Sequence, residues 1–196
     1  MALFTPSLLL AVAALAVLVG CADAPATAPD QAGPAVPAGV MRAPDTTDVQ
    51  GVSRARAQIQ PVGGGTASGT VTMAAVEGGV RVRAQLEGLS AQQYHALQVL
   101  RGRDCDADPD VHLGADDGAP HGGPYSLPGL RHAGDLGSIR GDEGTGRYDR
   151  VDAVLDLSGT RSPVGQAVVV RELRDDAASP GGAAGAVIGC GVLEPS

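Results

Sequence analysis

The stretch GGVRVRAQL, residues 78–86, decides which class of fold the chain can adopt. Every second residue from Val80 to Leu86 is apolar, and the residues between them are arginine or glutamine. An alternation of period two is the pattern of a β-strand with one buried face. A second alternating run, GTVTMAAV (69–76), precedes the glycine pair at 78–79, so the two runs predict a β-hairpin.

The rest of the chain also favours short strands. Further strand candidates lie at 55–61, 94–101, 151–157, 165–172 and 186–193, whereas almost nothing alternates between 102 and 150. The 29 glycines and the 2% of aromatic residues suit strands and turns better than helices. We therefore predict an all-β Greek-key barrel or sandwich with one long loop, and loops of that length usually carry function.

The N-terminus resembles an export signal. Residues 1–20 carry no charge and contain the apolar run LLLAVAALAVLVG (8–20), which is too short to span a membrane. The run ends in LVGC, the pattern of a bacterial lipoprotein cleavage site, with Cys21 as the lipidated residue. We expect a signal peptide at 1–20 and a lipoprotein anchored to a membrane, facing the periplasm or the cell exterior. The alternative is a plain signal peptide with a coincidental cysteine.

Residues 21–53 are rich in alanine and proline and predict an extended tether, followed by a folded domain at 54–194. If Cys21 carries lipid, Cys105 and Cys190 remain, and in an oxidising compartment they most simply pair. The net charge of −8 and the lack of a basic cluster along the chain argue against nucleic acid or anionic lipid as a partner.

Three of the four histidines lie in the irregular stretch, namely His112, His121 and His132, and Asp135 follows the last of them. Imidazole nitrogens and a carboxylate oxygen are ligands that zinc takes in a tetrahedron. The grouping predicts a zinc site; the alternative is a set of solvated loop histidines.

Four segments around these residues resemble the copper/zinc superoxide dismutase family: VHLGADDGAPHGGP (111–124), RHAGDLGSI (131–139), VVVRELRDD (168–176) and GCGVL (189–193). The resemblance runs from about Arg54 to Leu193. It implies an eight-stranded Greek-key β-barrel whose long loop is pinned by zinc and by a Cys105–Cys190 disulfide. It assigns the zinc ligands to the four residues above, and to Asp175 the role of orienting a zinc-binding imidazole.

The same resemblance places the family's copper histidines on residues that are not histidine. Two fall on Gln98 and Leu100, within HALQVLRGRDC (95–105), and a third falls on Arg171. His112, the ligand shared by both metals in the family, is retained, and His95 matches a histidine with a structural role. The family's substrate-guiding arginine falls on Val187.

These replacements predict zinc without copper. Leucine has no donor atom, glutamine is a weak one, and arginine is a permanent cation. Zinc cannot cycle between redox states, so it cannot replace copper in dismutation. We hypothesise that the Arg171 guanidinium occupies the place of copper and pairs with Gln98 or a nearby carboxylate; the alternative is an unremarkable surface arginine.

Three functions are compatible with this interpretation of the sequence. The first is an exported lipoprotein that binds zinc, has lost dismutase activity and serves as a binding or structural module, with a protein partner or dimer possible. The second is an active dismutase with an unconventional copper site. The third is metal buffering outside the cytoplasm, to which the acidic segments DCDADPD (104–110) and ADDGAPH (115–121) could add weak cation binding, although solvated loop is the simpler interpretation.

Overall fold

A computed structural model describes residues 51–196 of the chain. The predicted signal peptide, Cys21 and all but the last three residues of the predicted tether lie outside the described residues. Within 51–196, none of the helices has the length and apolar character needed to span a bilayer.

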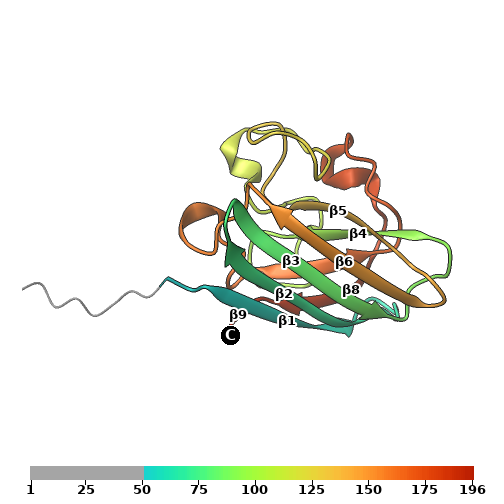
Figure 1. Ribbon diagram of the computed structural model, residues 1–196. Helices are drawn as coiled ribbons and strands as arrows, with labels where there is room; N and C mark the ends of the chain where they lie inside the picture. Colours follow the sequence, from blue (N-terminus) through green and yellow to red (C-terminus); the bar gives the residue numbers. More distant parts are fainter. Residues whose placement is uncertain (1–50) are drawn as a thin grey trace, which may run out of the picture. The chain divides into compact units, whose positions relative to one another are not determined.

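The described part is built almost entirely of strands (Figure 1), which confirms the all-β prediction. A two-residue ninth strand joins the eight that the family resemblance implied. Helix within the described part is limited to three short 3₁₀ turns at Ala115–Asp117, Gly159–Arg161 and Pro180–Ala183. The strands are β1 (Arg54–Pro61), β2 (Ser68–Val76), β3 (Gly79–Glu87), β4 (Tyr94–Val99), β5 (Asp135–Arg140), β6 (Thr145–Asp152), β7 (Ala167–Arg171), β8 (Val187–Val192) and β9 (Glu194–Pro195).

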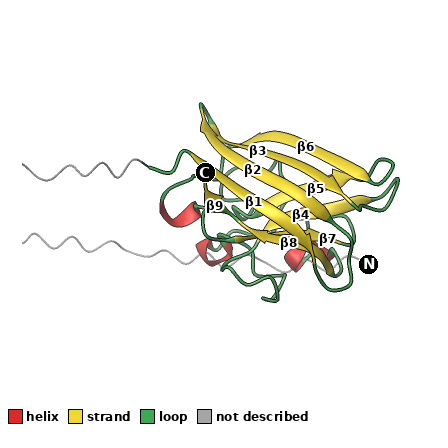
Figure 2. Ribbon diagram, turned by 90° about the horizontal axis from the view of Figure 1, so that it is seen from below, coloured by secondary structure: helices red, strands yellow, loops and turns green. Residues whose placement is uncertain are grey.

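The strands form an antiparallel, nearly closed barrel in the order β5-β4-β7-β8-β1-β2-β3-β6, and β9 pairs with β1 (Figure 2). Strand β1 joins the two halves, because Arg54–Ile59 pairs with β2 while Gln60 and Pro61 pair with β8. Strand β3 pairs with β6 instead of β4, which is the Greek-key connection that was predicted. The alternate residues of β3 from Val80 to Leu86 are buried in the core, each no more than 2% exposed.

The hairpin predicted at the glycine pair is present between β2 and β3. Val76 pairs with Gly79 across a two-residue turn of Glu77 and Gly78. Gly78 adopts a φ of +85°, which favours glycine. At Gly79 a Cβ atom would lie 2.1 Å from the carbonyl oxygen of Asp152 on β6, so glycine is needed there for close strand approach.

Two strands were not predicted, β5 and most of β6, and the strand predicted at 151–157 is wrong. The inward positions of β6 include Gly146 and Asp152, so its sequence lacks apolar alternation although its partner β3 has it. The strand ends at Asp152 because Asp152 Oδ1 accepts hydrogen bonds from the backbone N–H groups of Val154 and Leu155, which turns the chain.

Two loops lie side by side at one end of the barrel. The connection from β4 to β5 covers residues 100–134, and the connection from β7 to β8 covers residues 172–186 (yellow-green and red at the top of Figure 1). Hydrogen bonds join these loops to each other and to the outer face of β4 and β7. All the residues singled out as metal-site positions lie in these loops or at the adjoining ends of β4, β5, β7 and β8.

Candidate metal centre

The four predicted zinc ligands meet beneath the β4–β5 loop. The Nδ1 atoms of His112, His121 and His132 lie 2.6, 3.0 and 3.3 Å from one oxygen, Asp135 Oδ1. All four residues are buried, and one ligand atom from each lies within 4.8 Å of the others. Asp135 is the first residue of β5, so the sheet fixes the carboxylate while the loop carries the three imidazoles to it.

The far nitrogen of each imidazole faces an oxygen. His112 Nε2 donates to the Pro109 carbonyl (3.2 Å), and His132 Nε2 donates to the Ala119 carbonyl (3.0 Å). His121 Nε2 lies 2.8 Å from Asp175 Oδ1. Because these oxygens are acceptors, each Nε2 carries the proton and each Nδ1 of a neutral ring presents a lone pair to the centre.

This arrangement fits a cation. Three lone pairs and the carboxylate oxygen Asp135 Oδ1 converge, which requires a metal ion or bound protons between them. His132 Nδ1 is buried and has no hydrogen-bond partner among the described residues. Three imidazoles and one carboxylate are a closed tetrahedral set for zinc, and zinc binding satisfies the unpaired nitrogen.

Asp135 is prepared for this role by its second oxygen. Asp135 Oδ2 accepts hydrogen bonds from the backbone N–H groups of Gly122 (2.9 Å) and His132 (2.8 Å), which leaves Oδ1 for the centre. Burial alone would raise the pKa of Asp135, but its contacts with His112 and His121 outweigh it and lower that pKa far below its usual range. The carboxylate is therefore ionised at neutral pH.

His121 has a raised proton affinity. Burial lowers its pKa, yet hydrogen bonds to Asp135 and Asp175 on its two sides dominate and raise the pKa to about 9 when metal is not bound. In the apo protein at neutral pH, His121 therefore carries the positive charge that balances the buried carboxylates. A metal ion held by these residues would take over this role by displacing the proton.

Asp175 connects the zinc ligands to β4. One of its oxygens faces His121, and the other accepts a 2.8 Å hydrogen bond from Gln98 Nε2. Asp175 is 6% exposed and Gln98 is fully buried. The position predicted to orient a zinc-binding imidazole thus lies against that imidazole, and its second partner is one of the residues aligned with a copper ligand.

Gln98 and Leu100 lie on the outer face of the barrel wall, beneath the loops. Alternation along β4 sends Leu97 and Val99 into the core, whereas Leu100 packs in a small separate cluster with Val169 of β7. The backbone of Leu100 also forms an isolated β-bridge with His112. An apolar side chain therefore lies next to the histidine that aligns with the family's shared ligand. Val187, aligned with the family's guiding arginine, is half-buried against the same cluster.

Arg171, at the end of β7, lies with Gln98 beneath the loops and is 4% exposed. Its Nη1 donates to Gln98 Oε1 (3.4 Å), to the carbonyls of Pro109 (3.0 Å) and Gly181 (3.1 Å), and to Asp110 Oδ1 (3.2 Å). Its Nε and Nη2 donate to the Gly185 carbonyl at 3.0 and 2.7 Å. The guanidinium is therefore enclosed by five oxygen acceptors, which includes both partners that the hypothesis named.

These side chains do not fit copper. Among the described residues, the one imidazole nitrogen directed there is His112 Nε2, which is engaged with the Pro109 carbonyl that also accepts from Arg171. A guanidinium in the middle of the group repels a metal cation, and Leu100 offers no ligand atom. His95 is no substitute, since its Nε2 accepts from the Ser90 N–H (3.1 Å) and its Nδ1 donates to the Arg171 carbonyl (3.1 Å).

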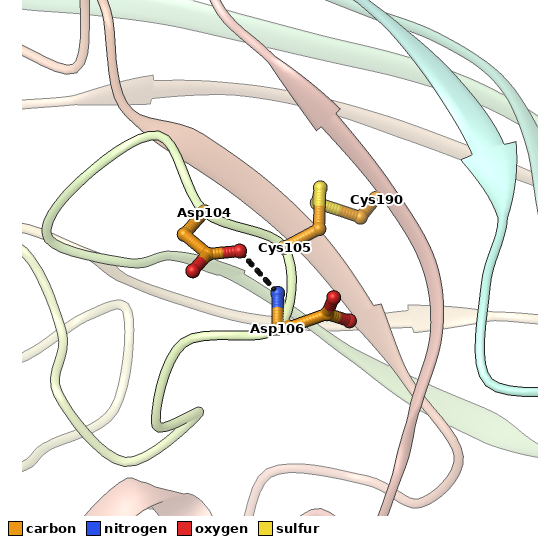
Figure 3. The surroundings of a disulfide bond; sticks show 4 residues. All are labelled: Asp104, Cys105, Asp106 and Cys190. Carbon is orange, nitrogen blue, oxygen red and sulfur yellow. Dashed lines mark hydrogen bonds between the residues drawn. A yellow bond between two sulfur atoms is a disulfide. The ribbon is translucent and has the colours of Figure 1, made fainter.

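The predicted disulfide is confirmed. Cys105 and Cys190 are bonded, with 5.9 Å between their Cα atoms, and tie the start of the long loop to β8 (Figure 3). Next to Cys105, the backbone N–H of Asp106 donates to Asp104 Oδ1 (2.9 Å). The disulfide fixes the segment that continues to Pro109, whose carbonyl meets both His112 and Arg171.

Several participants were not predicted from the sequence. The carbonyls of Pro109, Gly181 and Gly185 leave no signal in a sequence, because every residue has one. Asp110 was expected to be a solvated residue of an acidic segment, and it is exposed, but its Oδ1 also pairs with Arg171. In the other acidic segment, Asp116 and Asp117 form surface ion pairs with Arg101 and Arg161.

Comparison with known proteins gives one consistent result. The family described as copper/zinc superoxide dismutase (SODC) matches residues 67–193. Superoxide dismutase [Cu-Zn] 2 of Brassica juncea is 36% identical over 114 residues, 54% of this chain and 72% of its own. The extracellular superoxide dismutase [Cu-Zn] of Drosophila melanogaster is 36% identical over 126 residues, 58% and 67% of the two chains. The crystal structure of the clock protein EA4 superposes with a TM-score of 0.66 at 30% identity, covering 74% of this chain and 96% of that one.

Proposed function

Because the chain belongs to the copper/zinc superoxide dismutase family, we propose that it keeps the zinc half of the family's metal site and has lost the copper half. In this proposal it is an exported lipoprotein, anchored through Cys21, whose zinc and disulfide stabilise a binding or structural module. The oxidised Cys105–Cys190 pair and the similarity to an extracellular relative support export.

The observation that carries the proposal is the position of Arg171. Dismutation requires a metal that accepts an electron from one superoxide and donates one to the next, and the zinc ligands described above hold a metal that cannot do so. At the position aligned with a copper histidine, Arg171 supplies a buried, fixed positive charge instead. The zinc ligands are complete without solvent, which is the arrangement of a structural site.

The proposal is tested by a superoxide dismutation assay on the mature protein after metal removal and reconstitution with copper and zinc together. We expect the protein to show no more dismutase activity than the same concentration of free copper in the buffer. The matched control is the triple variant Gln98→His, Leu100→His and Arg171→His, which restores the aligned ligands and is expected to retain copper. Copper-dependent activity of the unmodified protein would overturn the proposal.

Anchoring is tested separately. The substitution Cys21→Ser is expected to move the protein from the membrane fraction to the soluble exported fraction without changing the domain's thermal unfolding. Retention of Cys21→Ser in the membrane fraction would show that the lipid attachment is wrong, while leaving the metal-site proposal unaffected.

A further inference from the structure

Arg171 is connected to two of the three zinc-site imidazoles, to one through a single intermediate and to the other through two. On one side, the Pro109 carbonyl accepts from Arg171 Nη1 (3.0 Å) and from His112 Nε2 (3.2 Å). The guanidinium helps hold this carbonyl in place, and the carbonyl in turn fixes the tautomer and orientation of His112. Partners of this kind keep a ligating nitrogen directed at its metal.

On the other side the connection passes through Gln98. Its Nε2 donates to Asp175 Oδ2 (2.8 Å) and to the Gly181 carbonyl (3.1 Å), so its oxygen must face Arg171. This fixes the orientation of an amide that could otherwise rotate by 180°. Asp175 then meets His121 through its other oxygen, at 2.8 Å.

The loop above the site closes onto the same residues. A Cβ atom on Gly181 would lie 1.9 Å from Asp110 Oδ1, and one on Gly182 would lie 2.7 Å from the Asp175 carboxylate. Both glycines have positive φ angles, 67° and 76°, so the chain can approach without side chains in the way. Arg171 binds the carbonyls of Gly181 and Gly185 and thereby holds this loop over the zinc ligands.

We propose that Arg171 is a positioning residue for zinc: a permanent internal cation that, through Pro109 and Gln98, orients His112 and His121 and slows zinc release. The inference rests on the zinc site proposed above and adds which residue controls the rate at which that site releases zinc. It differs from a general packing role because a fixed donor geometry is required, and a positive charge or an equal volume alone is insufficient.

The experiment measures the rate at which the zinc-loaded protein releases zinc to an excess of a chromophoric chelator. We expect Arg171→Met, which keeps the volume and loses the donors, to release zinc at least about tenfold faster, the scale typical of lost ligand-orienting partners. Arg171→Lys keeps the charge but not the forked geometry, so we expect its rate of zinc release to lie between those of the unmodified protein and Arg171→Met. The exposed Arg140→Met is the matched control and is expected to behave as the unmodified protein.

Two further measurements separate positioning from folding. Gln98→Leu breaks one connection and leaves Arg171 in place, so it should also release zinc faster even if Arg171→Met does not fold. In Arg171→Ala, millimolar methylguanidinium should slow zinc release again, whereas methylammonium at the same concentration should not. If release from Gln98→Leu and Arg171→Lys matches the unmodified protein, the inference is wrong. If the unmodified protein holds no zinc, the proposed function itself fails.

Discussion

Asp135 Oδ1 lies 2.6 Å from His112 Nδ1, and neither side chain is accessible to solvent. Two further Nδ1 atoms approach the same oxygen, and one of them, from His132, has no hydrogen-bond partner among residues 51–196. Donors and acceptors do not balance here unless a cation is bound. The consequences can be measured as stability, proton release and metal content.

Zinc should stabilise the folded domain strongly. If zinc binds only the folded chain, it adds about 4 kcal/mol to the free energy of unfolding when free zinc is roughly 1,000 times the dissociation constant. Thermal unfolding of the metal-free protein with and without zinc measures this shift, and Asp135→Asn should remove most of it. Equal melting temperatures with and without zinc would contradict the assignment of these four residues.

Zinc binding should also release a proton. The raised pKa of His121, about 9 in the metal-free protein, means that this group stabilises the apo fold fully below its ordinary pKa of about 6.5 and loses that effect as the pH rises through 9. Zinc competes with the same proton, so its apparent affinity should increase with pH up to about 9, with about one proton released per zinc at pH 7. Titration calorimetry in buffers of different ionisation enthalpy counts the protons; a count of zero would be inconsistent with the described hydrogen bonds.

Removal of the disulfide should cost stability. The bond closes a loop of 85 positions, and the chain-entropy model gives about 4–5 kcal/mol for a loop of that size. Urea unfolding of a Cys105→Ser, Cys190→Ser double variant, in the presence of saturating zinc, measures the loss. Cys21→Ser is the control because its position lies outside the described domain. A loss below about 1 kcal/mol would show that zinc alone pins the loop.

A buried ion pair and an exposed one offer a matched comparison. Arg131 and Asp152, both nearly inaccessible, are joined at 2.5 Å, and Arg131 also donates to the carbonyls of His132 and Asp135. Asp152→Ala leaves a buried guanidinium unpaired and should destabilise the domain by about 3–5 kcal/mol. Asp149→Ala removes the exposed partner of Arg81 and should have a much smaller effect in the same urea unfolding experiment. Equal losses would mean that burial does not control the value of these pairs.

The sequence was sufficient for the parts of the fold in which side chains alternate. β3, with valines inward and arginines outward, was readable residue by residue, and so was the hairpin that precedes it. β6 was not readable, because Asp152 and Gly146 occupy inward positions and its pairing is set by β3. A strand whose inward positions lack apolar residues has no periodic signal of its own.

The distribution of charge over the surface could not be predicted from the sequence either. No basic run occurs along the sequence, yet strand register gathers five arginines on the outer face of one half of the barrel. Arg56 and Arg83 share one row through Thr72, and Arg54 and Arg81 share the next through Ala74. Arg147 follows on β6, opposite Gln85. Asp149 lies on the same face and pairs with Arg81 and Arg83. The prediction of no nucleic-acid partner stays a prediction.

At the metal site, the sequence could identify ligand types and spacing but not the cage around Arg171. Three of its five acceptors are backbone carbonyls, at Pro109, Gly181 and Gly185, and these are placed by turns and by glycines with positive φ. Only tertiary structure shows that loops far apart in the chain supply them.

Loss of copper binding with retention of zinc is best tested by the metal content of the mature protein, measured by elemental analysis after complete metal removal and reconstitution with copper and zinc together. We expect close to one zinc and no retained copper per chain, with zinc lost in Asp135→Asn. Stoichiometric copper in the unmodified protein would contradict this expectation, because Gln98, Leu100 and Arg171 would then have to accommodate the metal that their side chains are argued to exclude.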